Sequence, residues 1–203
     1  RDRLRSRGLG DVYKRQEVYR ALAEQNADMV GWIRIEGTTI DYPVMQTPDD
    51  FNFYLRRNFD KEYSNLGTPY IQENCDLKTS DNLILYGHHM LDGGMFSDLE
   101  LYKDKDFLQE HRIIHFDTLD EIAEYEILAA IVTTAYRPDS FRYYEYTGGS
   151  QEQFEKYVSD CKRLSLYDTG VNAEYGDKLI TLSTCEYSQN DGRLLVVAKK
   201  TEG

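Results

Sequence analysis

The feature that most constrains this chain is a succession of short runs rich in β-branched, aliphatic and aromatic residues, separated by turn-forming residues. Such runs are typical of β-strands. There are about eight of them: Trp32–Ile35, Thr39–Val44, Thr68–Gln72, Asn82–Tyr86, Arg112–Asp117, Glu121–Val132, Lys178–Thr184 and Arg193–Lys199. Glu36-Gly37 separates the first two runs and predicts a hairpin turn. Strands at this spacing predict a mainly β fold, a closed barrel or a sandwich.

Three segments interrupt this pattern with a helical one. Glu17–Asn26 predicts a short helix, and Met95–Glu110 predicts two more. Gln151–Leu164 predicts a longer amphipathic helix, and Ser150 before it is a candidate N-cap. Its apolar stripe consists of Phe154, Val158, Cys161 and Leu164.

Length and charge exclude several classes of protein. The 203 residues suffice for one ordinary domain with its own core. The formal net charge of −12 disfavours a nucleic-acid backbone or an anionic lipid surface as the main partner. The longest apolar run, Ile127–Val132, is far shorter than the roughly 20 residues of a membrane span, so none is expected here. Three cysteines cannot all pair within the chain, so a disulfide scaffold is excluded.

The first sixteen residues differ from the rest. Residues 1–16 contain six basic and two acidic residues and show little apolar periodicity. A basic segment here is either a flank of a membrane anchor, an arm for anionic lipid, or a scar of cloning or sequence assembly, and we expect the scar. The expected organisation is therefore 1–16 outside the fold, 17–30 an N-terminal helical segment and 31–203 the β-barrel domain.

The three cysteines have different surroundings. Cys161 lies on the apolar stripe of the predicted long helix and is expected in the core. Cys75 lies in an acidic stretch that disfavours its thiolate. Cys185 ends a predicted strand, on the face that it shares with Thr181 and Ser183. Position alone makes Cys185 a structural cysteine, unless a base and a cation lie close to it.

Histidines supply the candidate base. His111 and His115 are four residues apart, but in a strand they would stand roughly 13 Å apart, too far to share a metal ion. His88 and His89 follow a predicted strand through Gly87, and loops after strands are where a scaffold presents catalytic groups. A solvated turn is the alternative for this pair.

Arg193 is the candidate cation. It opens the last predicted strand, after a seven-residue connection from Cys185. An antiparallel hairpin of that length would bring the guanidinium beside the thiol, where it would favour the thiolate and a developing oxyanion. The alternative is a surface arginine paired with Glu186 or Asp191.

These motifs together resemble a known family. Thr181-Leu-Ser-Thr-Cys185, Arg193 and the upstream Tyr86-Gly-His88 resemble the sortases, cysteine transpeptidases of Gram-positive cell surfaces. Further similarity points to class B, in the segments 26–35, 37–44, 50–59 and 88–99. The resemblance covers about residues 26–200. It implies an eight-stranded sortase β-barrel with an N-terminal helix and a long amphipathic helix before the strand that carries Cys185.

The resemblance also implies roles for individual residues. Cys185 would be the nucleophile, His88 the general acid and base, and Arg193 the group that holds the oxyanion. His89 does not match a catalytic position of the family and is treated as a neighbour. The substrate groove would be lined by Tyr86, Ser183, Thr184, Glu186, Asn52 and Leu55. No cofactor and no metal are implied.

The implied substrates are secreted proteins with a C-terminal sorting motif, cleaved after threonine through a thioacyl-enzyme. The acceptor would be a peptidoglycan precursor amine or a pilin amine, with no nucleic acid involved. The enzyme would act at the extracellular face of a Gram-positive cell membrane, held by an N-terminal anchor absent from this chain. Two alternatives stay open: a cysteine peptidase with water as acceptor, and a non-catalytic cell-surface binding domain.

Overall fold

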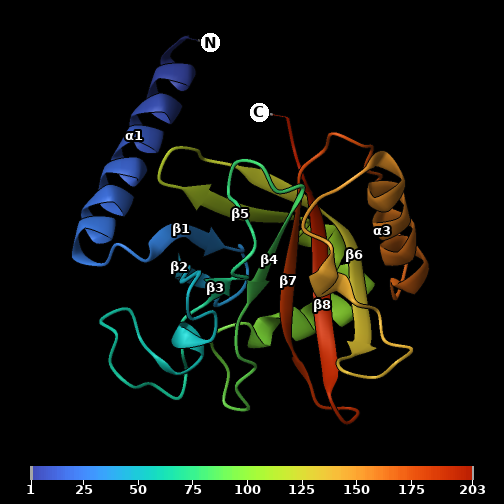
Figure 1. Cartoon of the computed structure of the whole chain (residues 1–203). Helices are drawn as coiled ribbons and strands as arrows, with labels where there is room; N and C mark the ends of the chain where they lie inside the picture. The colour runs from blue at the N-terminus through green and yellow to red at the C-terminus, as the bar shows by residue number, and fades with distance from the viewer. Residues whose placement is uncertain (1, 203) are drawn as a thin grey trace.

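The runs predicted as strands pair with one another in a closed barrel (Figure 1). The computed structural model describes residues 2–202, with side chains from residue 10 onward. Its strands are β1 Met29–Arg34, β2 Asp41–Met45, β3 Tyr70–Ile71, β4 Asn82–Tyr86, β5 Ile113–Thr118, β6 Glu124–Thr134, β7 Leu179–Glu186 and β8 Gly192–Lys200. Their order around the barrel is β1-β2-β3-β4-β7-β8-β6-β5. The predicted eight-stranded barrel is therefore confirmed over the described residues.

β7 is the strand that brings distant parts of the chain together. On one side it pairs in parallel with β4, and Tyr86 lies opposite Ser183. On the other side it pairs antiparallel with β8, and Cys185 lies opposite Arg193. The side chains of register partners lie on the same face of a sheet, so the register shows which residues of β4, β7 and β8 share a face.

The inner face of these three strands is apolar. Leu85, Leu182 and Val196 are register partners, and none of them is exposed. Burial of each such side chain contributes about 1.5–3 kcal/mol. Thr181 points to the other face, where its hydroxyl bonds to the Tyr157 hydroxyl at 2.8 Å. The row Thr181, Ser183 and Cys185 is therefore on the outer face of the barrel.

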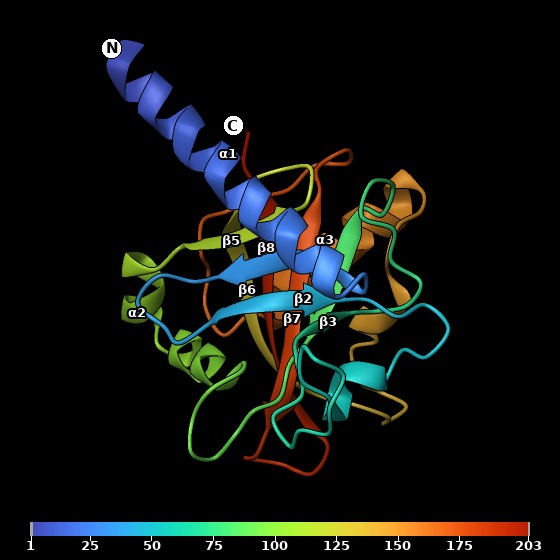
Figure 2. The same cartoon turned by 90° about the vertical axis from the view of Figure 1, so that its left-hand side faces the viewer.

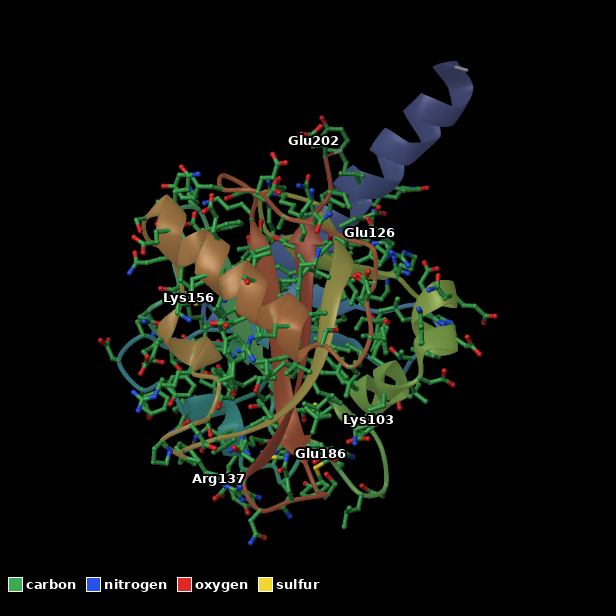
Figure 3. The ribbon with its side chains drawn as sticks, turned by 90° about the vertical axis from the view of Figure 1, so that its right-hand side faces the viewer. Lys103, Glu126, Arg137, Lys156, Glu186 and Glu202 are labelled. Carbon is green, nitrogen blue, oxygen red and sulfur yellow. The ribbon has the colours of Figure 1, made fainter. Side chains whose placement is uncertain are left out.

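The long helix α3, Gln151–Leu164, covers part of that outer face (Figure 3). It has the predicted bounds, and Ser150 is its N-cap in a complete capping box with Gln153. Phe154 and Cys161 of the apolar stripe are fully buried against the barrel. Leu164 at the end of the stripe packs at the edge of the same core.

The N-terminal helix is longer than predicted. α1 spans Asp2–Gln25, so the segment before Glu17 continues the helix. Its C-terminal half packs on the barrel, where Tyr19 stacks on Trp32 of β1 and donates to Asp117 of β5 at 3.0 Å. Its N-terminal half extends past the barrel (Figures 1 and 2). None of the described helices is both long and apolar enough to cross a membrane.

Short helices occupy the connections. They are η1 Phe53–Arg56, η2 Ser97–Lys103, α2 Lys105–Glu110 and η3 Tyr143–Glu145. η2 and α2 are the two short helices predicted within Met95–Glu110. The strand prediction for His111 is wrong, because this residue caps the C-terminal end of α2, while His115 lies within β5 as predicted. The hairpin between β1 and β2 is present, with Gly37 at a φ of +78° in the left-handed region.

Candidate active site

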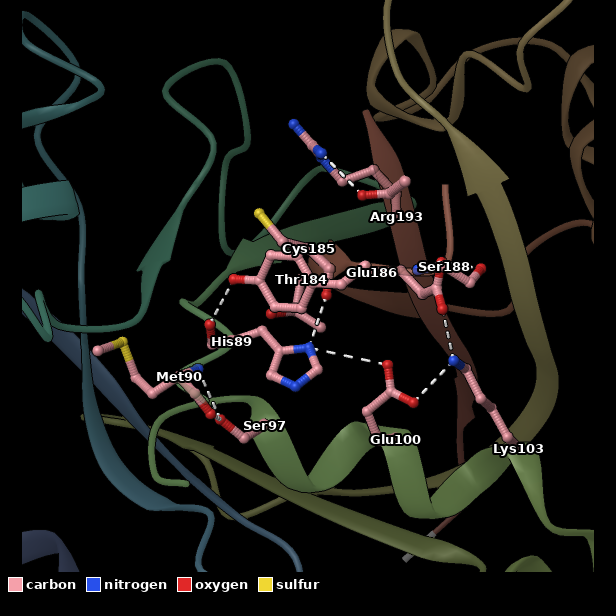
Figure 4. A network of polar contacts seen from close by, with 12 residues as sticks. His89, Met90, Ser97, Glu100, Lys103, Thr184, Cys185, Glu186, Ser188 and Arg193 are labelled. Atoms are coloured by element: carbon pink, nitrogen blue, oxygen red, sulfur yellow. Dashed lines mark hydrogen bonds and ion pairs between the residues drawn. The ribbon is translucent and has the colours of Figure 1, made fainter. Parts of the chain in front are cut away.

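Cys185 lies near the end of β7 and is half-buried. Its antiparallel partner on β8 is Arg193, so the hairpin predicted from the connection length is present. Cross-strand partners have Cβ atoms about 4.5–5.5 Å apart, which places the thiol and the base of the arginine side chain side by side. In Figure 4 the Cys185 sulfur and the Arg193 guanidinium extend to the same side of β7.

The loop after β4 continues along β7. The Gly87 amide donates to the Ser183 carbonyl at 3.2 Å, and the Thr184 hydroxyl donates to the Gly87 carbonyl at 2.7 Å. The β4–β7 pairing ends at Tyr86 and Ser183, and the same register continued by two residues along the loop would set His88 level with Cys185. The nucleophile candidate therefore lies between the His88 loop on one side and Arg193 on the other.

Gly87 is required for this path of the loop. A Cβ atom on Gly87 would stand 2.5 Å from the nearest ring atom of Phe96, which is fully buried. The Phe96 amide also donates to the His88 carbonyl at 2.9 Å. Only a residue without a side chain lets the strand pass this close to the ring before it presents His88.

The His88 ring faces η1. Its Nε2 lies 2.7 Å from the Leu55 carbonyl oxygen, and a carbonyl only accepts, so Nε2 carries the proton. Nδ1 is thus the nitrogen left for proton transfer in the neutral ring. η1 is fixed by the buried Tyr54, whose hydroxyl donates to Asp28 and accepts from Asn26, both at 2.8 Å.

Arg193 is held by neutral groups. Its Nη1 donates to the Gly192 carbonyl at 2.8 Å, and its guanidinium carbon lies 5.8 Å from the centroid of the Tyr136 ring, within cation–π range. The alternative of an ion pair with Glu186 is not what the structure shows, because that carboxylate binds Lys103. The charge of the guanidinium is therefore available to a substrate oxygen.

Four predicted groove residues lie on the Cys185 side of the sheet or at its margin. Tyr86 donates to Gln72 at 2.5 Å and packs against Tyr70, with ring centroids 5.5 Å apart. Ser183 shares a 2.8 Å hydrogen bond with Tyr143 of η3. Asn52 lies beside the Tyr70 hydroxyl, with 3.5 Å between Asn52 Oδ1 and that oxygen. The backbone carbonyl of Leu55 binds the His88 ring, as described above.

Burial raises the pKa of Tyr70 to about 12, with smaller contributions from neighbours that include Cys185.

The side chains of Thr184 and Glu186 point to the opposite face of β7, because successive residues of a strand alternate. Thr184 is buried and bonds to Gly87. Glu186 is only 3% exposed; its carboxylate accepts from Lys103 Nζ and from the Ser188 hydroxyl, each at 2.6 Å. Burial alone would raise the pKa of Glu186, but these bonds hold it below its usual value. Either residue can meet a peptide at Cys185 only through its backbone.

The remaining cysteines are buried. Burial raises the pKa of the Cys75 thiol to about 11, with Glu73 adding to the rise, and burial also raises the pKa of the Cys161 thiol. Both are therefore poor nucleophiles, for a reason that is chiefly desolvation. Among the described residues, no three His, Cys, Asp or Glu side chains gather where they could hold a metal ion.

A cavity of about 530 Å³ opens near Met29, Leu179 and Lys200. Leu179 begins β7 and Lys200 ends β8, so the cavity lies at the ends of these two strands that are farthest from Cys185, with Met29 at the start of β1. The candidate site is therefore identified by its chemistry and not by the size of a hollow.

Sequence reasoning missed the polar groups beneath Cys185. Lys103 and Glu100 lie on η2, and each carries only the ordinary pattern of a charged helix surface in the sequence. The sequence assigns His89 no role beyond that of a neighbour of His88, but in the structure its Nδ1 lies 2.9 Å from the Cys185 carbonyl oxygen. The one available signal was the adjacency of His89 to His88.

Comparison with known proteins gives the family. The model of the sortase domain matches residues 33–201. Sortase B of Staphylococcus aureus is 35% identical over 185 residues, covering 89% of this chain and 73% of that protein, and sortase B of Listeria monocytogenes is 37% identical over 183 residues, covering 89% and 72%.

Solved structures agree with this assignment. The structure of Clostridium perfringens sortase B superposes with a TM-score of 0.84 at 29% identity, covering 90% of this chain and 99% of that one. A Staphylococcus aureus sortase B–substrate complex superposes with a TM-score of 0.84 at 32% identity, covering 99% and 94%. The chain thus belongs to the sortase family, in which it is a cysteine transpeptidase of the sortase B type.

Proposed function

We propose that this enzyme cleaves a C-terminal sorting motif of secreted proteins after threonine and transfers the acyl group to an amine. The Cys185 thiolate attacks the threonine carbonyl, and Arg193 stabilises the oxyanion. His88 gives a proton to the leaving amine, which leaves a thioester on Cys185. An incoming amine then attacks the thioester, His88 takes its proton, and the thiolate is released.

The observation that carries this proposal is the set of contacts that β7 makes on its two sides. Cys185 is the direct partner of Arg193 on β8, and the loop that leads to His88 is bonded to β7 through Gly87. The three groups come from separate parts of the chain, and a nucleophile, an acid–base group and an oxyanion donor are what acyl transfer requires.

The sorting peptide would lie between η1 and η3. Asn52 and Leu55 form one wall, and Tyr86 and Ser183 contribute the floor beside Cys185. Thr184 and Glu186 would contribute backbone groups. A solved structure of Staphylococcus aureus sortase B in complex with a substrate superposes over nearly the whole chain, which supports substrate binding by this fold.

The acceptor would be an amine of a peptidoglycan precursor or of a pilin. Aminolysis competes with water only when the amine is held close to the thioester. The catalytic unit would be residues 31–203, acting at the extracellular face of a Gram-positive cell membrane.

The test is a product analysis with the purified protein. A sorting-motif peptide is incubated with and without an added amine, such as a short glycine peptide, and the products are separated by mass. We expect ligated product to increase with amine concentration while hydrolysed product declines. The Cys185→Ala variant should give neither product.

Two outcomes would contradict the proposal. Hydrolysis at a rate and yield that no amine alters would make the enzyme a cysteine peptidase that uses the same Cys185 and His88. Cleavage that persists in Cys185→Ala would remove the nucleophile from the scheme.

A further inference from the structure

The second histidine of the pair, His89, has no part in the reaction as written. Because the backbone is extended here, the side chains of His88 and His89 point to opposite sides. The His89 ring lies beneath β7, with 13% of its side chain exposed. Its Nδ1 is 2.9 Å from the carbonyl oxygen of Cys185, so Nδ1–H donates to the backbone of the nucleophile candidate itself.

A second hydrogen bond joins the loop that carries His89 to the segment after Cys185. The Tyr187 hydroxyl donates to the His89 carbonyl at 2.7 Å, and the two rings lie 4.8 Å apart. Tyr187 follows Cys185 by two residues. His89 is therefore bonded to the chain at Cys185 and just after it, while its neighbour His88 is placed by the same backbone.

Three charged side chains, Glu100, Lys103 and Glu186, form a chain of polar contacts from His89 back to the residue after Cys185 (Figure 4). In the following this closed set of contacts is called the ring. Glu100 Oε1 lies 3.7 Å from His89 Nδ1, and Glu100 Oε2 lies 2.7 Å from Lys103 Nζ. Lys103 Nζ also binds Glu186 at 2.6 Å, and Glu186 is covalently next to Cys185. The ring ties η2, the loop after β4 and the end of β7 to one another. Figure 3 shows Lys103 beside Glu186 at the end of the barrel away from Glu202.

We propose that His89 is a positioning residue for the transfer reaction: its hydrogen bond to the Cys185 carbonyl sets the distance and orientation of the nucleophile relative to His88. This inference rests on the proposed function, in which those two residues react. His89 lies on the face of β7 away from the peptide groove, so its loss should change the chemical step and leave peptide binding nearly intact. Small misplacements of reacting groups cost up to about 100-fold in rate.

The decisive comparison is between two substitutions of His89. His89→Leu removes the donor and keeps an apolar side chain of similar reach. His89→Asn keeps an N–H donor near the position of Nδ1. We expect His89→Leu to lower kcat for acyl transfer about 5- to 50-fold with KM for the sorting peptide within about twofold, and His89→Asn to recover kcat to within about threefold of the parent.

The control is His115→Leu, which removes a histidine of β5 that lies beside Glu124. β5 is not adjacent to β4, β7 or β8 in the barrel. This substitution should leave kcat and KM unchanged. Circular dichroism at the assay temperature gives the folded fraction of every variant, and kcat is expressed per folded molecule. Equal kcat in His89→Leu and the parent would overturn the proposal, and so would an Asn variant as slow as the Leu variant.

A measurement without substrate separates this inference from the proposed function. The alkylation of Cys185 by iodoacetamide, located by peptide mass mapping, is timed near pH 7 and near pH 10. The rate in His89→Leu at either pH should differ from that of the parent by about threefold or more, because loss of the hydrogen bond displaces the thiol, and His89→Asn should restore the parent rate. An unchanged rate in His89→Leu would contradict the role of His89 even in an active enzyme. A parent protein that never acylates would refute the proposed function, while the alkylation rates would still decide the role of His89.

Discussion

Glu186 is a carboxylate buried beside the nucleophile candidate, and Lys103 is its cationic partner. The pair can be broken by Lys103→Met, which keeps much of the volume of the side chain and removes its charge. Glu186 then retains the Ser188 hydroxyl at 2.6 Å and the Ser188 amide at 3.1 Å. It loses the Lys103 contact at 2.6 Å.

The magnitude follows from the burial of the two partners. Removing one partner of a fully buried ion pair costs about 3–5 kcal/mol. Here the Glu186 side chain is 2% exposed, but that of Lys103 is 34% exposed, and water screens part of the interaction. Glu100 loses the same cation but is itself 31% exposed, so its share is small. We therefore expect the free energy of unfolding to fall by about 2 kcal/mol at neutral pH.

The pH dependence has a definite sign. The pKa of Glu186 is held below its usual value, 4.5, so its ionised form adds stability above that value, and the stability is lost as pH falls through the folded-state pKa. Without Lys103, burial remains and raises the pKa of this carboxyl. The difference between parent and variant should therefore be largest near pH 7.5 and shrink toward pH 4, because protonation of Glu186 removes the buried charge that the variant leaves without its cation.

Urea unfolding followed by Trp32 fluorescence at the two pH values measures this difference. Lys156→Met on α3 is the matched control, because Lys156 is 75% exposed and its pair with Asp160 should contribute less than about 0.5 kcal/mol. Adding Glu186→Gln to Lys103→Met should recover at least half of the loss. An equal loss at both pH values, or no recovery with Glu186→Gln, would mean that Lys103 does not stabilise the fold by pairing with the Glu186 carboxylate.

Two further substitutions test the scaffold. Gly87→Ala should destabilise the protein by about 1–3 kcal/mol and slow acylation, because its Cβ would meet the buried Phe96 ring. Thermal unfolding and acylation rates check this, and Gly10→Ala, where nothing lies within 4 Å, should lower neither. Ser150→Ala removes the capping box of α3 and should cost about 1 kcal/mol in urea unfolding. It should not alter kcat, since α3 begins near the end of the barrel opposite Cys185.

Much of the fold could be predicted because its signals are local. The alternation of apolar residues in Lys178–Thr184 and the stripe in Gln151–Leu164 each reflect contacts within one element, and both elements appear where they were expected. The pairing of Cys185 with Arg193 depends only on the length of one hairpin. Family resemblance supplied the eight-stranded barrel, but the order of the strands around it was not predicted, because no local pattern contains it.

The parts that escaped prediction depend on contacts between distant residues. The bond from His89 to Cys185 joins residues 96 apart, and that from Lys103 to Glu186 joins residues 83 apart. Strand alternation alone puts Glu186 on the face opposite Cys185, but the sequence does not reveal that Lys103 binds the carboxylate there. The length of α1 was underestimated because residues 1–16 show little amphipathic pattern, and a helix needs none where it does not pack on the barrel.

The most direct test of the account is to locate the acyl group on the enzyme. The parent protein is mixed briefly with a sorting-motif peptide in the absence of an amine, quenched in acid and digested for mass spectrometry. We expect the N-terminal fragment of the peptide, ending at threonine, to be attached to Cys185 as a thioester that an added amine releases. A stable acyl group on any other residue, or cleavage of the peptide with no acylated Cys185 at any time, would contradict it.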